Sequence, residues 1–223
     1  MNELGVIWLT IKLATVTTAW LLVLGTPLAW WLANGHSRWR TAVEAVVALP
    51  LILPPTVLGF YLLIAFAPDS SLGQLWQQLT GSRLAFSFSA LVIGSVLYSM
   101  PFVVQPLQAA FRQLDRGLLE AAAVLGAPAR DRWLTIILPS CRHSFITAAS
   151  LGFAHTVGEF GVVLMIGGNI PGETQVLSIA LFDRVESLQF AQAHALAAGL
   201  MAFSFVMLYL LYRRGDGNWR LQS

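Results

Sequence analysis

The chain has 223 residues, of which 57% are hydrophobic and only 11% charged, and its mean hydropathy is +0.69. A soluble domain usually carries about 25% charged residues, so the composition excludes an ordinary soluble enzyme and indicates an integral membrane protein. The formal net charge of +2 is too small to indicate a nucleic-acid-binding protein. The single cysteine, Cys141, excludes an internal disulfide and any metal site built from several cysteines, and we expect no bound metal.

The first long apolar stretch covers residues 13–33, enough to cross a hydrocarbon core of about 30 Å. The residues before it lack the basic start and the small-residue cleavage site of a secretory signal, so we expect a retained span. The only lysine, Lys12, does not stand in a Gly-x-x-x-x-Gly-Lys-Ser/Thr context. The chain is therefore not expected to have an ATP-binding phosphate loop of its own.

The second apolar stretch, residues 42–67, contains the sequence LPLILPP at residues 49–55. Each proline removes a helix hydrogen bond and bends the chain, and carbonyls freed in lipid are tolerated only where protein or water satisfies them. Two interpretations stay open: a kinked packing helix, or a broken helix beside a translocation path. In the second, Pro54, Pro55 and Thr56 are candidate pathway or gate residues.

A polar segment at residues 68–83 is expected to be an external loop, with Gly73 and Gly81 as breakers. The third span covers residues 84–110 and contains no charged residue. Hydroxyl groups inside a span can face a polar path. Ser95 and Ser99 are therefore further pathway candidates.

The fourth span, residues 144–167, contains two ionisable residues, His155 and Glu159. Because they are four positions apart, they are expected to share one helix face and to pair. Ionisable groups at membrane depth are costly and usually face a bundle interior or a water-filled path. Three roles stay open: a structural pair, a gate in a pathway, or the acid and base of a membrane enzyme.

The sequence NIPGET at residues 169–174 is rich in turn-forming residues. The segment up to residue 192 contains Asp183 and Arg184 and is expected to form a short external helix. The last span covers residues 193–212.

Five spans make the connecting segments alternate between the two sides of the membrane. Ten of the 13 basic residues then fall on one side, and only Lys12, Arg83 and Arg184 fall on the other. Basic residues are enriched on the cytoplasmic side, so we expect the N-terminus outside the cell and the C-terminus in the cytoplasm. The basic residues expected in the cytoplasm are Arg38, Arg40, Arg112, Arg116, Arg130, Arg132, Arg142, Arg213, Arg214 and Arg220.

Residues 111–143 form a polar island between the third and fourth spans. Asp115 can cap a short helix, Gly126 can take the positive φ of a helix end, and Pro128 suits the first turn of a second helix. On these residues alone the island is a helical hairpin between two spans.

The spacing within the island is more specific. The island contains Glu-Ala-Ala, then Gly after three further residues, then Ile-x-Leu-Pro after nine more. This pattern resembles the cytoplasmic "EAA loop" of ABC-importer permeases. The resemblance implies a coupling helix that docks into a groove of an ATPase subunit, seated closely by small alanines and kept in register by the Glu120 charge. The matching positions are Glu120, Ala121, Ala122, Gly126, Ile136, Leu138 and Pro139.

Further motifs resemble the molybdate ABC-transporter permease subunit, the ModB type, over about residues 15–214. Sulfate and tungstate permeases share much of the proline-rich and Glu-Phe-Gly pattern. Many relatives carry an arginine where this chain has His155. The motifs are LPLILPP at residues 49–55, LAFS at 84–87, GEFG at 158–161 and NIPGET at 169–174.

The resemblance implies an all-α integral membrane protein with five transmembrane helices of the type I ABC importer (MetI-like) fold. Residues 1–223 are then one permease domain of the bacterial inner membrane, with residues 111–143 as its cytoplasmic coupling loop. A membrane enzyme is the alternative of a different class.

The implied complex contains two copies of the chain in the lipid bilayer, two ABC ATPase subunits and a periplasmic molybdate-binding protein. The partner ATPase uses the ATP, so the chain itself is not catalytic and needs no cofactor. Sulfate, thiosulfate and tungstate are the alternative cargoes. The candidate docking residues for the binding protein are Asn169, Pro171, Gly172, Glu173 and Thr174.

Overall fold

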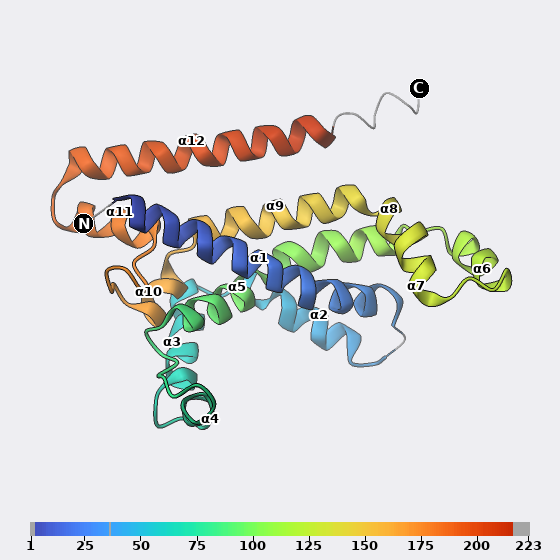
Figure 1. Cartoon of the computed structure of the whole chain (residues 1–223), viewed down its shortest axis with the longest axis horizontal. Helices are drawn as coiled ribbons and strands as arrows, with labels where there is room; N and C mark the ends of the chain where they lie inside the picture. The colour runs from blue at the N-terminus through green and yellow to red at the C-terminus, as the bar shows by residue number, and fades with distance from the viewer. Residues whose placement is uncertain (1–2, 36, 216–223) are drawn as a thin grey trace.

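The computed structural model describes residues 3–35 and 37–215, and every regular element in these ranges is helical. Four long helices run along the long axis of the molecule (Figure 1). Of these, α1 packs most extensively against α5, and α9 packs against both. The long helices are α1 (Glu3–Asn34), α5 (Phe88–Arg112), α9 (Arg142–Gly158) and α12 (Phe190–Gly215).

Shorter helices occupy the two ends and one side of this bundle. The side and one end are formed by α2 (Arg40–Ala48), the 3₁₀ turn η1 (Leu49–Leu51), α3 (Pro55–Phe66), α4 (Ser71–Thr80), α10 (Gly161–Gly167) and α11 (Leu177–Glu186). The other end is formed by α6 (Arg116–Val124), α7 (Ala129–Arg132), the π-helical turn η2 (Trp133–Ile137) and α8 (Leu138–Ser140).

Three helices, α1, α5 and α12, are long and apolar enough to cross a membrane alone. Two more spans arise if each of two bent helix pairs counts as one. The first pair, α2–η1 with α3, bends by 109°, and the second, α9 with α10, bends by 61°. Counted in this way the described residues contain the five spans expected, and the all-α prediction is confirmed.

The proline-rich segment breaks its span instead of kinking it. Pro54 has an extended ψ of 134° and α3 begins at Pro55, because a residue that precedes a proline is pushed out of the helical region. The chain thus turns sharply at the expected position, which favours the broken-helix interpretation.

The segment at residues 68–83 was expected to be a loop, but most of it folds into helix α4. The Ser70 side chain caps this helix by accepting the Gly73 N–H at 2.9 Å, and Gly81 ends it with φ of 72°. Gly81 is a breaker as predicted, but Gly73 is not. Gly73 lies inside the helix, where a Cβ would come within 2.0 Å of the Ala67 carbonyl oxygen, so close packing explains the glycine.

The short helix α10 forms the centre of one of the two hydrophobic clusters. Val162 and Ile166 are completely buried, between α3 on one side and α5 on the other. Glycines on both neighbours permit this approach. A Cβ on Gly59 of α3 would lie 2.7 Å from Met165, and one on Gly94 of α5 would lie 2.2 Å from Ile166.

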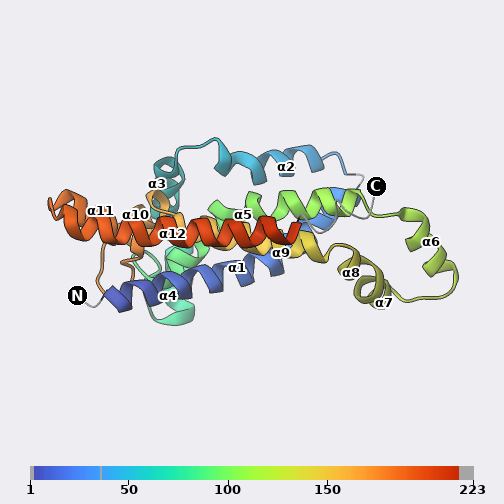
Figure 2. The ribbon, with the colours of Figure 1, turned by 90° about the horizontal axis from the view of Figure 1, so that it is seen from above.

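Different helices lie at the two ends of the bundle. Figures 1 and 2 show helices α6, α7 and α8 projecting beyond one end, where α1 and α12 also finish and α2 begins. Helices α3, α4, α10 and α11 lie at the opposite end, together with the start of α1. The segments that carry the excess of basic residues therefore share one end of the molecule, apart from Arg220, which lies outside the described residues.

Candidate functional site

The polar island folds as the sequence predicted, into two short helical pieces with a glycine between them. The Asp115 carboxylate accepts the Gly117 N–H at 2.8 Å and starts α6. Gly126 has φ of 85°, and the chain reverses there as the Ala127 N–H donates to the Ala122 carbonyl at 3.0 Å. Pro128 lies just before α7 rather than in its first turn, a difference of one residue.

Helix α6 and the residue that follows it expose apolar side chains that no other described residue covers. Val124 is 88% exposed and Leu125 is 87% exposed. Glu120 and Ala121 are exposed on the same helix. Exposed apolar groups gathered on a projecting helix are typical of a protein-docking surface.

The second half of the motif has a mixed environment. Leu138 and Pro139 are exposed and Ile136 is half-buried. The residue between them, Ile137, is 3% exposed and anchors the turn, although the motif does not include it. The structure therefore brings the motif residues to one projecting segment while their neighbours hold that segment to the bundle.

An aromatic cluster attaches the island to the spans. The Trp133 ring lies 5.0 Å from that of Trp30 in α1 and 5.9 Å from that of Phe111 in α5. Trp30 therefore packs against protein. Aromatic pairs of this kind stabilise a contact by about 0.5–1.5 kcal/mol beyond buried area, so these rings hold the island against α1 and α5.

A polar cluster next to the island was not predicted from the sequence. Glu44 in α2 pairs with Arg112 in α5 at 3.2 Å, the one ion pair found among the described side chains. The same carboxylate oxygen accepts a hydrogen bond from Gln108 Nε2 at 3.0 Å. The cluster ties α2 to α5, and only the tertiary fold brings its members together.

A cavity of about 510 Å³ lies where the two broken spans meet. Four of the predicted pathway residues line it, namely Pro55, Thr56, His155 and Glu159. Pro54 does not line this cavity. Ser95 and Ser99 are completely buried in α5 behind its wall.

His155 is held by α5 and not by Glu159. The Ser99 hydroxyl lies 2.8 Å from His155 Nδ1, and the imidazole stacks on Phe102 with 4.0 Å between ring centroids. Helix α9 ends at Gly158, and Glu159 has an extended backbone with ψ of 132°. The expected ion pair is wrong for this reason, because the two residues do not share a helix, and no His155–Glu159 bond forms among the described side chains.

The carboxylate of Glu159 is buried and unpartnered. The residue is 3% exposed, and neither carboxylate oxygen finds a hydrogen-bond partner in the described part of the chain. The Ser95 side chain lies beside it, and the Ser95 hydroxyl also lacks a partner within this part. Such buried groups are rare and require an explanation.

The predicted turn at residues 169–174 is present, with positive φ at Gly168 and Gly172. Thr174 does not fit the expected docking role, because its side chain is completely buried. Its hydroxyl accepts the Ile170 N–H at 3.1 Å and donates to the Gly167 carbonyl at 2.7 Å. Thr174 therefore holds the turn from inside. Pro171, Gly172 and Glu173 are exposed.

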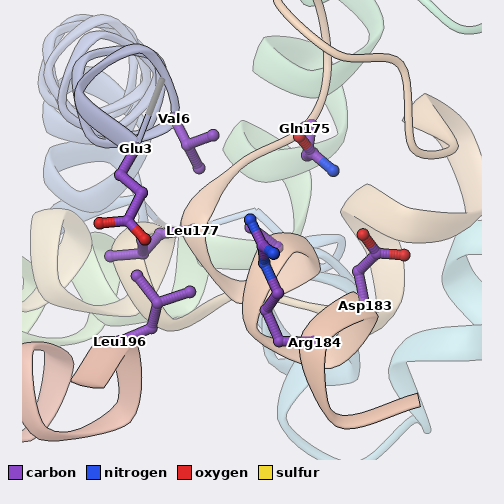
Figure 3. A pocket seen from close by; sticks show the side chains of 8 residues that line it. Glu3, Val6, Gln175, Leu177, Asp183, Arg184 and Leu196 are labelled. Carbon is purple, nitrogen blue, oxygen red and sulfur yellow. The ribbon is translucent and has the colours of Figure 1, made fainter. Parts of the chain in front are cut away.

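A small cavity of about 10 Å³ lies between α1, α11 and α12 and is lined by Gln175, which follows the turn (Figure 3). It has room for about one water. Gln175 Nε2 donates to the Asn169 side chain at 2.6 Å, and Asn169 in turn donates to Asp183 at 3.3 Å. Asn169 is thus also partly engaged in holding the turn, which rests on α11.

Five spans, two of them broken and packed on one another, with a helical island at one end, define the transmembrane permease of an ABC importer. Solved structures share this fold. A bacterial ABC transporter that imports the acidic polysaccharide alginate superposes with a TM-score of 0.72 at 17% identity, over 100% of this chain and 82% of that chain. The MetNI methionine ABC transporter in an inward-facing conformation gives 0.69 at 16% identity, over 97% of this chain and 99% of that chain.

The chain belongs to the family described as "Binding-protein-dependent transport system inner membrane component", whose profile matches residues 25–214. It is 56% identical to the molybdenum transport system permease protein ModB of Azotobacter vinelandii, over 95% of this chain and 93% of that protein. It is 32% identical to ModB of Haemophilus influenzae over 83% of this chain and 81% of that protein. The sulfate transport system permease protein CysT of Salmonella typhimurium is 30% identical, over 90% of this chain and 72% of that protein.

Proposed function

We propose that the chain is the permease subunit of an ATP-driven importer that carries molybdate across the inner membrane. The observation that carries this proposal is the 56% identity with a molybdenum permease over 95% of this chain and 93% of the relative. The sulfate permeases are 29–31% identical, and the chain covers only 66–72% of their length. Length and identity therefore both favour molybdate over sulfate.

The island is proposed to couple ATP hydrolysis to transport. The exposed Val124 and Leu125 provide apolar area for a groove on a partner, and Glu120 provides a charge at the same surface. Since Trp133 packs on Trp30 and Phe111, a partner that moves the island also moves α1 and α5. The partner fitted by this surface is an ABC ATPase subunit, which supplies the ATP chemistry.

The opposite end is proposed to receive the periplasmic binding protein. The exposed tip of the turn, Pro171 to Glu173, lies on a base fixed by Thr174 and α11. A rigid turn suits repeated docking because little order is lost on binding. A second copy of the chain is proposed to complete the pathway, with the Glu159 cavity lining it.

The distribution of charged residues supports one orientation in the membrane. The end that carries the island also carries the excess of arginine, which favours the cytoplasm. We therefore propose that the island and the end of α12 face the cytoplasm and that the start of α1 faces the periplasm. The alternative of a membrane enzyme is not favoured, because its acid and base, His155 and Glu159, do not meet.

The test is uptake of labelled molybdate in cells from which this chain has been deleted and then restored. We expect uptake to return and excess sulfate not to compete. Full competition by sulfate or tungstate would move the cargo to that oxyanion. No change in uptake of any of the three would refute the proposed cargo class.

A further inference from the structure

The break between α9 and α10 positions a carboxyl group that no pairing explains. Glu159 follows the last residue of α9, and the Ser178 hydroxyl fixes its backbone by donating to its carbonyl at 2.5 Å. Its carboxylate oxygens are buried and unpartnered within the described residues, although the residue lines the cavity between the two broken spans.

No positive charge from the described chain reaches this cavity. Helix α5 contributes Tyr98, with Ser95 behind it, and α9 contributes His155. The neighbouring half-helices contribute Thr56, Pro55, Phe160 and Gly161, none of which titrates. His155 is already engaged by Ser99 and stacked on Phe102. An unpaired ionised carboxylate is very costly in such surroundings, whereas its neutral form is not.

We propose that Glu159 is a neutral carboxylic acid in the wall of the translocation pathway and that its O–H donates a hydrogen bond to the oxyanion cargo when the cavity widens. This inference rests on the proposed function. A tetrahedral oxyanion can only accept hydrogen bonds, and an ionised carboxylate can only accept them too. The neutral form of Glu159 adds a hydrogen-bond donor beside the hydroxyls of Thr56 and Ser95. It also removes the repulsion between a carboxylate and the oxyanion, which two copies of the chain would double.

The test compares uptake of labelled molybdate across a pH series in proteoliposomes that hold the full transporter complex. Wild-type uptake is expected to fall on the alkaline side once Glu159 ionises, by about tenfold per pH unit for each Glu159 proton that transport requires. Glu159→Gln keeps a neutral donor, so it is expected to stay within about threefold of wild type at neutral pH and to lose the alkaline fall. Glu186→Gln, the same change at an exposed position of α11, is expected to keep the wild-type pH profile.

Two results would overturn the inference. One is an assembled Glu159→Gln complex that hydrolyses ATP but imports nothing, because the ionised form would then be required. The other is an alkaline fall that persists unchanged in Glu159→Gln.

An infrared measurement on the purified complex checks the protonation state without any cargo. The carbonyl band of a protonated carboxylic acid is expected in wild type and in Glu186→Gln and is expected to be absent from Glu159→Gln. If wild type lacks the band, the inference fails whatever the cargo is. If the band is present but wild-type proteoliposomes import no oxyanion, the proposed function and the donor role fail together, and the neutral state of Glu159 stands.

Discussion

Gly161 lies directly against Pro55, so the break in one span touches the break in the other. A Cβ on Gly161 would lie 2.7 Å from the Pro55 Cβ, a distance that real side chains do not adopt. The two residues are more than a hundred positions apart, yet they fix how α3 and α10 pack. Both lie at the edge of the cavity that Glu159 lines, so the shape of this cavity depends on their contact.

Gly161→Ala tests this contact. The added methyl group must push Pro55 away, and overpacking of this kind destabilises a protein by about 1–3 kcal/mol. We expect a lower unfolding temperature in detergent and reduced uptake. The matched control is Gly158→Ala, three residues earlier, where a Cβ would meet nothing within 4 Å. Equal stability of the two variants would contradict the close contact.

Ser99→Ala tests the support of His155. The variant leaves Nδ1 of a half-buried imidazole without its 2.8 Å partner, and an unpaired buried polar group costs about 1–3 kcal/mol. His155→Phe removes the other partner and preserves stacking on Phe102. We expect the double variant to lose less stability than the sum of the single variants, as measured by thermal unfolding. Additive losses would mean that the two side chains do not interact.

The sequence predicts most of the fold because hydropathy and turn chemistry are local signals. Asp115 and Gly126 mark the start and end of α6 where the structure has them. The predicted His155–Glu159 pair fails because it assumes a continuous helix, and the helix ends at Gly158. The glycines that flank Glu159 and Phe160 are the available signal for such a break.

The remaining site residues could not be found from local patterns because their partners are distant in the chain. Ser99 meets His155 across 56 positions, and Trp133 meets Trp30 across about a hundred. The sequence around Thr174 is the same whether this threonine supports the turn or docks a partner. Only its burial, which depends on the packing of Gly167 beneath it, separates a structural threonine from an exposed docking residue.

Thr174→Val tests the structural role of this threonine. Valine keeps the shape but removes the hydroxyl, so the Ile170 N–H and the Gly167 carbonyl lose a partner. We expect a loss of about 1–3 kcal/mol in stability, measured by thermal unfolding. Glu173→Gln is the control, because Glu173 is exposed at the tip of the turn and the variant should keep its thermal stability. Loss of the Glu173 charge should weaken only the stimulation of ATPase activity by the binding protein. Unchanged stability in Thr174→Val would show that the Thr174 hydroxyl does not stabilise the turn.

Glu120→Lys tests the proposed coupling surface. A reversed charge at a docking contact costs a few kcal/mol, and each 1.4 kcal/mol is about a tenfold change in association. We therefore expect uptake to fall at least about tenfold while the permease still folds, because Glu120 is exposed and makes no bond in the described chain. Copurification of the ATPase subunit and labelled uptake are the measurements. Glu186→Lys makes the same charge change at the opposite end of the molecule and should leave copurification of the ATPase subunit unchanged. Normal uptake by Glu120→Lys would refute the coupling assignment.

The orientation can be tested with cysteine labelling, because the only native thiol is poorly reactive. Cys141 is 3% exposed, and burial raises the pKa of its thiol. The thiolate is the reactive form, so at neutral pH a raised pKa leaves less of it, and labelling should increase only as the pH rises well above neutral.

In a Cys141→Ala background, the exposed positions Glu186 and Arg130 mark the two ends of the molecule. A membrane-impermeant maleimide added to intact spheroplasts should label Glu186→Cys and should label Arg130→Cys only after the membrane is opened. The reverse pattern would place the island outside the cell, where there is no ATP for a partner to use, and would refute both the orientation and the coupling role of the island.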